Sequence, residues 1–356
     1  MTVHTHALPP HMEAEIHDVL SDWKSIVARY QRPDTGAAVW QLANTLLPLI
    51  GLWVAMYYAY AYSLLLMLAL GVVASFMLTR TFIIQHDCGH YSFLKSRKAC
   101  DKLGWFISLF TTVPYTYWSR VHSFHHGHVG QLEHRDVGDI NFLTVEEYNA
   151  RSWWGRVRYR IFRSAPVIMA VAPLLYITVM CRIPKVKYPG WDPVHLRLHL
   201  NNLMIVAVYA LLGYTLGWAR FAAVQGTIVL GFSAIAFWFF FVQHQHEETY
   251  MRWHDEGEWD YLLAAIKGAT LYDLPRVIHW LTGDIGYHHI HHLSSRIPNY
   301  HLARCARENP VLQRFVTKVT FWESLPMITN KLWDEQQGRM VTMREFNALN
   351  KQTSLL

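Results

Sequence analysis

The chain has 356 residues, of which 52% are hydrophobic and only 16% are charged, below the quarter that is usual in soluble domains. This composition favours one membrane-embedded unit over two or three soluble domains. The net charge of +6 comes without a Lys/Arg run interleaved with aromatic residues, which argues against nucleic acid as a partner and favours anionic lipid headgroups.

The first predicted membrane element is a transmembrane hairpin. Residues 1–31 are polar and have no apolar stretch, so no cleavable signal is expected, and residues 1–36 are expected to form a cytoplasmic tail. Two apolar blocks follow, residues 37–60 and 62–84, and each has the ~20 residues that a spanning helix needs. Basic residues flank the pair on its outer sides and none lies in the turn, so both outer ends are expected in the cytoplasm. The N-terminal histidines, His4, His6, His11 and His17, are expected to be tail residues.

The next two apolar segments are shorter than the ~20 residues of a spanning helix. Residues 103–118 are broken by Gly104 and Pro114, which predicts a re-entrant or interfacial segment. Residues 166–181 are equally short and are predicted not to cross. If they crossed, the basic residues that follow would lie outside, against the positive-inside tendency. These are Arg182, Lys185, Lys187 and Arg197.

Residues 200–218 and 221–242 are long enough to form a second hairpin. The predicted fold is therefore an all-α integral membrane protein with four transmembrane helices in two hairpins, interfacial helices and a cytoplasmic helical cap. We expect one domain, with a first hairpin at 37–84, a cytoplasmic or interfacial region at 85–198, a second hairpin at 199–242 and the cap at 243–356.

The 22 histidines are concentrated in clusters. His86 and His90 follow the first hairpin at a spacing of four, which puts both imidazoles on one helical face, and Gly89 between them would let another helix or a metal approach closely. Two HxxHH patterns each place three imidazoles on one face, and chance is a poor explanation for both. They are His122, His125 and His126, and His288, His291 and His292.

The number of clustered imidazoles indicates two metal ions. Imidazole binds zinc, copper, iron and nickel, so the ligand type leaves the metal open. Eight histidines are twice the ligands of one tetrahedral zinc, whereas two metals sharing eight or nine would keep room for oxygen or water. His244, at the end of the last apolar block, is preferred as a ninth ligand over His246. His246 and His254 are expected to be solvated or interfacial, and structural roles are expected for His128, His134, His279, His289 and His301.

Ligating imidazoles usually donate their other N–H to an acceptor, so carboxylates are expected behind the clusters. Asp87, Asp139 and Asp284 lie close to them in sequence. For Asp284, a helix N-cap is an equally good interpretation.

The motifs HDCGH, HSFHH and HHIHH, in this order around two hydrophobic hairpins, resemble the histidine boxes of the membrane fatty acid desaturase family. The flanking stretches, among them VPY before box two, VQHQ after the last span and RIPNY after box three, resemble the bacterial methyl-end group, called delta-12 or omega-6 desaturases. The resemblance covers residues 85–305. Three positions depart from the family's pattern: His128 and His134 stand where residues other than histidine are expected, and Asp284 stands where Asn is common.

The resemblance implies a non-haem centre of two Fe ions that uses O2 as co-substrate. The box histidines named above would be the ligands, with His244 matching the family's additional histidine. It also implies a separate electron donor such as ferredoxin or cytochrome b5, because the chain contains no haem-binding HPGG motif.

The expected activity is introduction of a cis double bond into the acyl chain of a membrane lipid or acyl-CoA, at a delta-12/omega-6 position. Trp105, Tyr115 and Trp118 are expected to line the substrate tunnel. The protein is expected to be an integral membrane protein with its active site on the cytoplasmic side, in the inner membrane if it is bacterial. A di-iron lipid or alkane hydroxylase is the nearest alternative. A transporter is disfavoured, because the apolar blocks contain almost no polar residues. A haem electron carrier is a further alternative, which an absorption spectrum without a haem Soret band would exclude.

Overall fold

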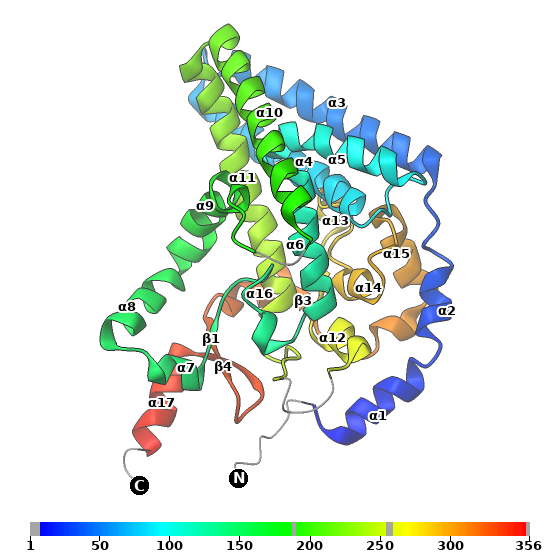
Figure 1. Cartoon of the computed structure of the whole chain (residues 1–356), viewed down its shortest axis with the longest axis vertical. Helices are drawn as coiled ribbons and strands as arrows, with labels where there is room; N and C mark the ends of the chain where they lie inside the picture. The colour runs from blue at the N-terminus through cyan, green and yellow to red at the C-terminus, as the bar shows by residue number, and fades with distance from the viewer. Residues whose placement is uncertain (1–7, 187–189, 254–258, 354–356) are drawn as a thin grey trace.

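The computed structural model describes residues 8–186, 190–253 and 259–353. Four helices are long and apolar enough to cross a membrane, which confirms the predicted fold class (Figure 1). Two of them extend past the predicted ends and carry histidines into the protein. These spans are α3 (Thr35–Ala59), α4 (Leu64–Gly89), α10 (Asp192–Leu216) and α11 (Trp218–His244).

Side-chain caps define the first hairpin. Asp34 accepts a hydrogen bond from the Ala37 N–H at the start of α3, and Ser63 accepts one from Leu66 at the start of α4. Helix α4 is the most deeply buried span. In its most apolar stretch 61% of the residues are buried, against 22% in α3 and in α10. Glycines allow α11 to lie close to α4: a Cβ at Gly71 would fall 2.6 Å from Thr227 Cγ2.

The segment predicted as re-entrant or interfacial forms two short helices instead of a span. Helices α5 (Arg97–Thr111) and α6 (Tyr115–His128) meet at Thr112, whose φ of 60° and the following Pro114 break the chain direction. Beyond them, α8 (Trp153–Phe162), η2 (Val167–Val171) and α9 (Ala172–Thr178) form an arm with a bend of 58°, a broken span or a re-entrant loop. That residues 166–181 do not cross therefore stays a prediction.

Below the spans in Figure 1 lies the cap, and the N-terminal segment packs on it. Helices α1 (Pro10–Val19) and α2 (Trp23–Ala28) and the turn between them bury Ile16, Leu20 and Val27 against apolar residues of the region 262–312. His17 lies 3.3 Å from Asp260. From residue 8 on, the predicted tail is thus part of the folded core, whereas His4 and His6 lie outside the described residues. The short helices of the region from box two to the C-terminus are η1 (Leu132–His134), α7 (Val145–Ala150), η3 (Met180–Arg182), α12 (Tyr261–Lys267), α13 (Arg276–Leu281), α14 (His288–Leu293), α15 (Asn299–Glu308), η5 (Pro310–Gln313), α16 (Phe321–Met327) and α17 (Met343–Thr353).

Two small sheets, which the sequence interpretation missed, join distant parts of the chain. The first has the order β1-β4-β5, with β1 parallel to β4 and β4 antiparallel to β5, and the second pairs β2 with β3 in parallel. Strands of two to five residues carry too little alternation to be recognised from sequence. They are β1 (Leu143–Thr144), β2 (Leu271–Asp273), β3 (Lys318–Thr320), β4 (Asn330–Asp334) and β5 (Arg339–Thr342).

Candidate metal centre

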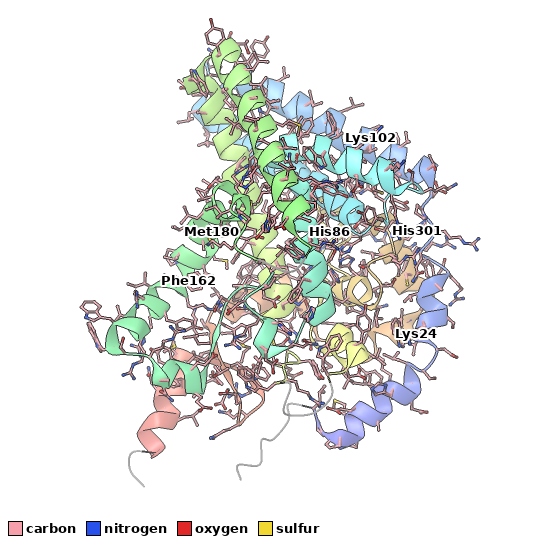
Figure 2. All side chains as sticks on the ribbon, in the orientation of Figure 1. Lys24, His86, Lys102, Phe162, Met180 and His301 are labelled. Carbon is pink, nitrogen blue, oxygen red and sulfur yellow. The ribbon has the colours of Figure 1, made fainter. Side chains whose placement is uncertain are left out.

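Four helix ends bring nine histidines together where the spans meet the cap. His86 lies in the last turn of α4 and His90 is its C-cap, while His244 is the last residue of α11. Helix α6 contributes one HxxHH set and α14 the other. Figure 2 shows His86 in the interior, whereas Lys24 and His301 lie at the periphery. All nine side chains are buried except that of His90, which is half-buried. The nine residues are those named in the sequence prediction.

The imidazoles form two groups, each able to hold a metal ion. In the larger group, one nitrogen of each of five residues lies within 4.8 Å of all the others. Its members are His86, His90, His122, His126 and His291. The smaller group contains His125, His244 and His292, and His288 joins it because its Nε2 lies 2.9 Å from that of His244 and 3.1 Å from that of His292.

The spacing of the nitrogens fits a shared cation. Nε2 of His126 lies 3.1 Å from that of His122 and 3.0 Å from that of His291. Nitrogens bound to one ion at about 2.1 Å lie about 3.0 Å apart when their bonds are at right angles, and about 3.4 Å apart in a tetrahedron. Among the described residues, Nε2 of His90 and of His125 have no hydrogen-bond partner despite their burial. Buried nitrogens without partners are costly, and a metal ion would satisfy them.

Three imidazoles are oriented by groups behind them. Nδ1 of His244 donates to the Gly268 carbonyl at 2.9 Å, which leaves its Nε2 free to bind a metal. Nδ1 of His86 lies 3.0 Å from Asp87 Oδ1, and Nδ1 of His125 lies 2.5 Å from Asp139 Oδ1. The two carboxylates thus stand where the sequence interpretation expected them.

Asp284 has a different environment. Within the described part of the chain, no hydrogen bond joins its side chain to a clustered imidazole, and the N-cap of α14 is Tyr287. Its φ is 55°, and burial raises the pKa of its carboxyl to about 6, against the opposing effect of the nearby Arg80. Neither role expected for Asp284, behind a ligand or at a helix N-cap, is found in its contacts.

Burial keeps the clustered imidazoles in the form that binds metals. Desolvation, followed by the repulsion of neighbouring histidines, holds the pKa of His90, His122, His126, His288, His291 and His292 well below its usual range. These groups are therefore neutral near pH 7, as metal ligation requires.

The three aromatic residues expected to line a tunnel lie in different surroundings. Trp118 stacks on His122, with ring centroids 4.7 Å apart and an interplanar angle of 14°. Tyr115 is buried and donates to the Cys88 carbonyl at 2.9 Å, while the Trp105 indole donates to Thr116 at 3.0 Å. Only Trp118 of the three lies against a clustered histidine.

Gly89 allows the first two boxes to meet, as predicted. A Cβ at this position would lie 2.8 Å from the Cβ of Ser119 in α6. Gly138, with a φ of +88°, similarly lets the loop that carries Asp139 lie against His125, because a Cβ there would be 2.9 Å from that of His125.

The remaining histidines that the structure describes lie outside both groups. His246 is buried, not solvated or interfacial as expected, and burial lowers its pKa to about 3. His254 lies outside the described residues. His128 stacks on Phe124 with centroids 3.9 Å apart, and His279 stacks on Tyr287. His134 lies beside His128, His289 is fully buried, and His301 bonds to the Tyr30 carbonyl at 3.0 Å.

Contacts that tie the boxes together could not be found from the sequence. Asp87 Oδ2 accepts from both the backbone N–H and the side-chain amide of Asn299, at 2.6 and 2.8 Å. Arg80, buried in α4, donates to the Trp280 carbonyl before box three and to Thr45 at 3.0 Å. The RIPNY stretch that contains Asn299 resembles the desaturase family, but nothing in its sequence indicates a partner for Asn299.

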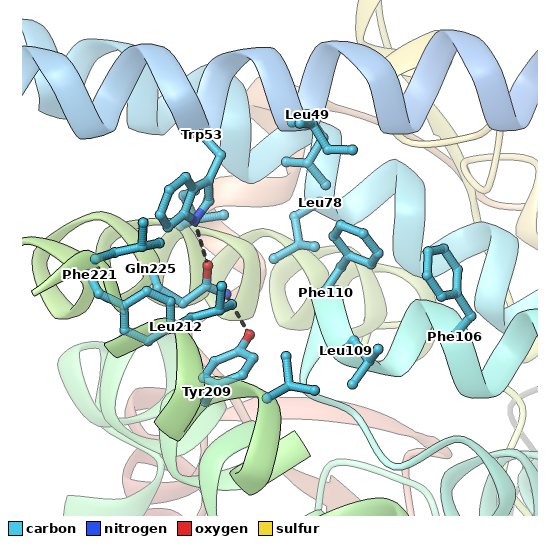
Figure 3. Close-up of a pocket in the computed structure, with 14 residues that line it drawn as sticks. Leu49, Trp53, Leu78, Phe106, Leu109, Phe110, Tyr209, Leu212, Phe221 and Gln225 are labelled. Atoms are coloured by element: carbon cyan, nitrogen blue, oxygen red, sulfur yellow. Dashed lines mark hydrogen bonds between the residues drawn. The ribbon is translucent and has the colours of Figure 1, made fainter. Parts of the chain in front are cut away.

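An apolar cavity of about 270 Å³ lies among the spans (Figure 3). Its polar edge is a chain of two hydrogen bonds, from the Trp53 indole to Gln225 at 3.0 Å and from the Gln225 amide to the Tyr209 hydroxyl at 2.7 Å. None of the three expected tunnel aromatics lines it. The lining residues are Leu49, Ile50, Trp53, Leu78, Phe106, Leu109, Phe110, Val208, Tyr209, Leu212, Leu216, Phe221, Gln225 and Ile228.

One family model and several known proteins match this chain, and their descriptions agree with one another. Residues 63–321 match the family model described as fatty acid desaturase. The chain is 39% identical over 318 residues to "Fatty acid desaturase" of Bacillus subtilis, covering 89% of each protein. It is 27% identical to "sn-1 oleoyl-lipid 12-desaturase" of Synechocystis sp., covering 77% of each. It is also 29% identical to "Omega-3 fatty acid desaturase, endoplasmic reticulum" of Nicotiana tabacum, over 66% of this chain and 62% of that protein.

Proposed function

The chain belongs to the fatty acid desaturase family, oxidoreductases that act on acyl chains with O2, and from this premise we propose that it places a cis double bond at a delta-12/omega-6 position of a membrane acyl chain. The observation that carries the proposal is the meeting of nine imidazoles in two groups at the ends of two spans. Acyl chains of bilayer lipids lie in the same apolar layer as these spans.

We propose two iron ions as the metals. One would be held by the five-residue group, and the other by His125, His244, His288 and His292. Iron with O2 supplies the oxidising power to remove hydrogen from unactivated methylenes, which no side-chain acid or base can do. The protein holds the imidazoles neutral and oriented through Asp87, Asp139 and the Gly268 carbonyl.

The cavity among the spans is proposed to receive the methyl end of the acyl chain. Leu78, in its lining, lies eight residues before His86 on the same helix, about 12 Å along the axis at 1.5 Å per residue. The lining of the cavity is almost entirely apolar, as the binding of a hydrocarbon chain requires. A chain that enters this far would present methylenes near its middle to the histidine groups.

The double-bond position rests on the relatives. The Synechocystis protein is named for position 12 of oleoyl lipid, and the Nicotiana protein for the omega-3 position. We favour the former position, with a monounsaturated oleoyl chain as substrate, because the former match covers more of both chains. The relative with the highest of the identities given above, from Bacillus subtilis, has a name that gives no position.

Electron supply and sidedness complete the proposal. A separate donor such as ferredoxin or cytochrome b5 would deliver the electrons, and the cap with its histidines would lie on the cytoplasmic side. The basic residues at the outer ends of the first hairpin support this orientation.

Analysis of the products tests the proposal and separates it from the nearest alternative, a hydroxylase with the same centre. The protein would be expressed in a host without polyunsaturated lipids and supplied with isotopically labelled oleoyl or linoleoyl lipid, with the His125→Ala variant as an inactive control. We expect a diene from oleoyl lipid as the main product by gas chromatography and mass spectrometry. A hydroxy acid as the main product would refute the desaturation, and a triene from linoleoyl lipid alone would move the position to omega-3.

A further inference from the structure

Helix α8 and the residues on either side of it form a strongly basic segment outside the metal centre. Residues 151–163 contain five arginines, and no acidic residue occurs between residues 148 and 191. Within the described part of the chain, no carboxylate pairs with the guanidinium of Arg151, Arg156 or Arg158. Arg151 and Arg158 are exposed, and Arg156 is half-buried. These three charges are thus available to a partner outside the chain.

One face of α8 is anchored to the protein. Tyr159 is buried and accepts the Leu143 N–H at 3.1 Å. Arg163, four residues later and only 1% exposed, donates to Gln245 Oε1 and to the Asn330 carbonyl, each at 2.7 Å. Residues four apart lie on the same side of a helix. The anchored side fixes which residues of α8 point outward.

The outward face carries large apolar side chains together with Arg158, which lies four residues after Trp154 and three before Ile161. Trp154 and Ile161, seven residues and about two turns apart, are 67% and 58% exposed, and Trp153 beside them is 63% exposed. Exposed apolar residues continue along the bent arm, with Val171 and Leu175 each about half exposed. Figure 2 labels Phe162 and Met180 on this arm, which runs along one edge of the molecule in Figure 1. A face of this kind would be unfavourable in water.

We propose that α8 lies in the membrane interface and that its arginines bind the headgroups of anionic phospholipids. Tryptophans favour the interface between hydrocarbon and water, and arginines extend from an apolar surface to reach phosphates. Helix α9 packs against the span α11, so the arm starts beside the hydrocarbon layer. This inference rests on the proposed membrane location, but not on the proposed reaction.

An acidic protein, such as an electron donor, is the competing partner for the arginines. The exposed apolar residues favour lipid, because Trp154 and Ile161 lie on the same outward side as Arg158, where hydrocarbon can cover the apolar side chains while a headgroup phosphate meets the guanidinium. The surface of an anionic membrane accommodates the apolar residues and the arginines at once. Each basic residue near such a surface contributes about fivefold in affinity.

Fluorescence quenching by brominated lipids tests the proposal without measuring activity. The full chain would be placed in nanodiscs of phosphatidylcholine that contain a minor fraction of brominated phosphatidylglycerol or brominated phosphatidylcholine. The difference between the wild type and the W153F/W154F variant isolates quenching at α8 from that of the other tryptophans. We expect brominated phosphatidylglycerol to quench the fluorescence of Trp153 and Trp154 at least twofold more strongly than brominated phosphatidylcholine does. High salt should reduce the preference.

The R151Q/R156Q/R158Q variant should lose the preference, whereas R304Q/R307Q/R314Q, with three exposed cap arginines changed, should keep it. Three outcomes would overturn the proposal: no quenching of Trp153 and Trp154 by either lipid, equal quenching by both lipids in the wild type, and an unchanged preference in the α8 variant. If the α8 variant keeps the lipid preference but binds an acidic electron donor more weakly, the surface is a protein docking site.

Discussion

The carboxylate of Asp87 joins box one to the segment that follows box three, because it accepts two hydrogen bonds from Asn299, 212 residues later in the chain. Its other oxygen lies 3.0 Å from Nδ1 of His86. Asp87 therefore fixes both the orientation of one imidazole and the position of α15 relative to α4.

Replacing Asp87 by Asn should weaken metal binding. The amide has the size of the carboxylate but loses its charge and one acceptor oxygen, so His86 and Asn299 cannot both keep their bonds. Loss of such a supporting group typically costs 10–100-fold in metal affinity or activity. Metal content and turnover of the purified variant measure the effect, and the exposed Asp18→Asn serves as control. Unchanged metal content and turnover in Asp87→Asn would show that Asp87 does not support the metal ligand His86.

His244 and His246 should differ although both are buried. We expect about two irons per chain in the wild type and a clear loss in His244→Ala, because its Nε2 lies 2.9 Å from that of His288. His246→Ala should keep its iron, since His246 belongs to neither group. Metal analysis of both variants decides this. Equal losses or the reverse order would contradict the ligand assignment, and one zinc without iron in active protein would contradict the proposed metal.

Gly89→Ala should destabilise the protein, because the added methyl would lie 2.8 Å from Ser119 Cβ and push α4 and α6 apart. Overpacking of this kind costs about 1–3 kcal/mol. Gly127→Ala is the matched control: Gly127 lies in α6 beside His126, and a Cβ there meets nothing within 4 Å. This change should be neutral or stabilise the helix by up to about 1 kcal/mol. Thermal unfolding in detergent compares the two, and a stable Gly89→Ala would show that the helices can separate.

The metal-free protein should lose stability on acidification. Burial lowers the pKa of His122, His126 and His291 in the folded chain, whereas the same groups in the unfolded chain take up protons near pH 6.5. Below that pH the unfolded state binds more protons, so the free energy of unfolding falls as pH falls, by up to about 1.4 kcal/mol per pH unit for each group. Melting temperatures at pH 7.5 and pH 5.5 should show the decrease. Equal or higher stability at pH 5.5 would contradict burial of neutral imidazoles.

Leu78→Phe should shorten the acyl chains that the enzyme accepts, because the larger ring would occupy the proposed methyl-end cavity on the side of His86. Leu66→Phe, on the same helix but 51% exposed and outside the cavity lining, should leave the products unchanged. Product analysis with C16 and C18 lipids measures the preference. An unaltered profile in Leu78→Phe, with normal metal content, would place the methyl end elsewhere.

The sequence alone determined the four spans and the nine clustered histidines. Span length and the three-to-four-residue spacing of imidazoles are local properties, so they can be read without knowledge of the fold. The tertiary structure decided which imidazoles share a group, since His126 of α6 meets His291 of α14 only through long-range packing. It also decided that Asp87 meets Asn299 and that Asp284 lies apart from the imidazoles, because these contacts depend on how α4, α14 and α15 pack. Short strands such as β1 form for the same reason: their partners lie far along the chain, and two residues alone carry no recognisable pattern.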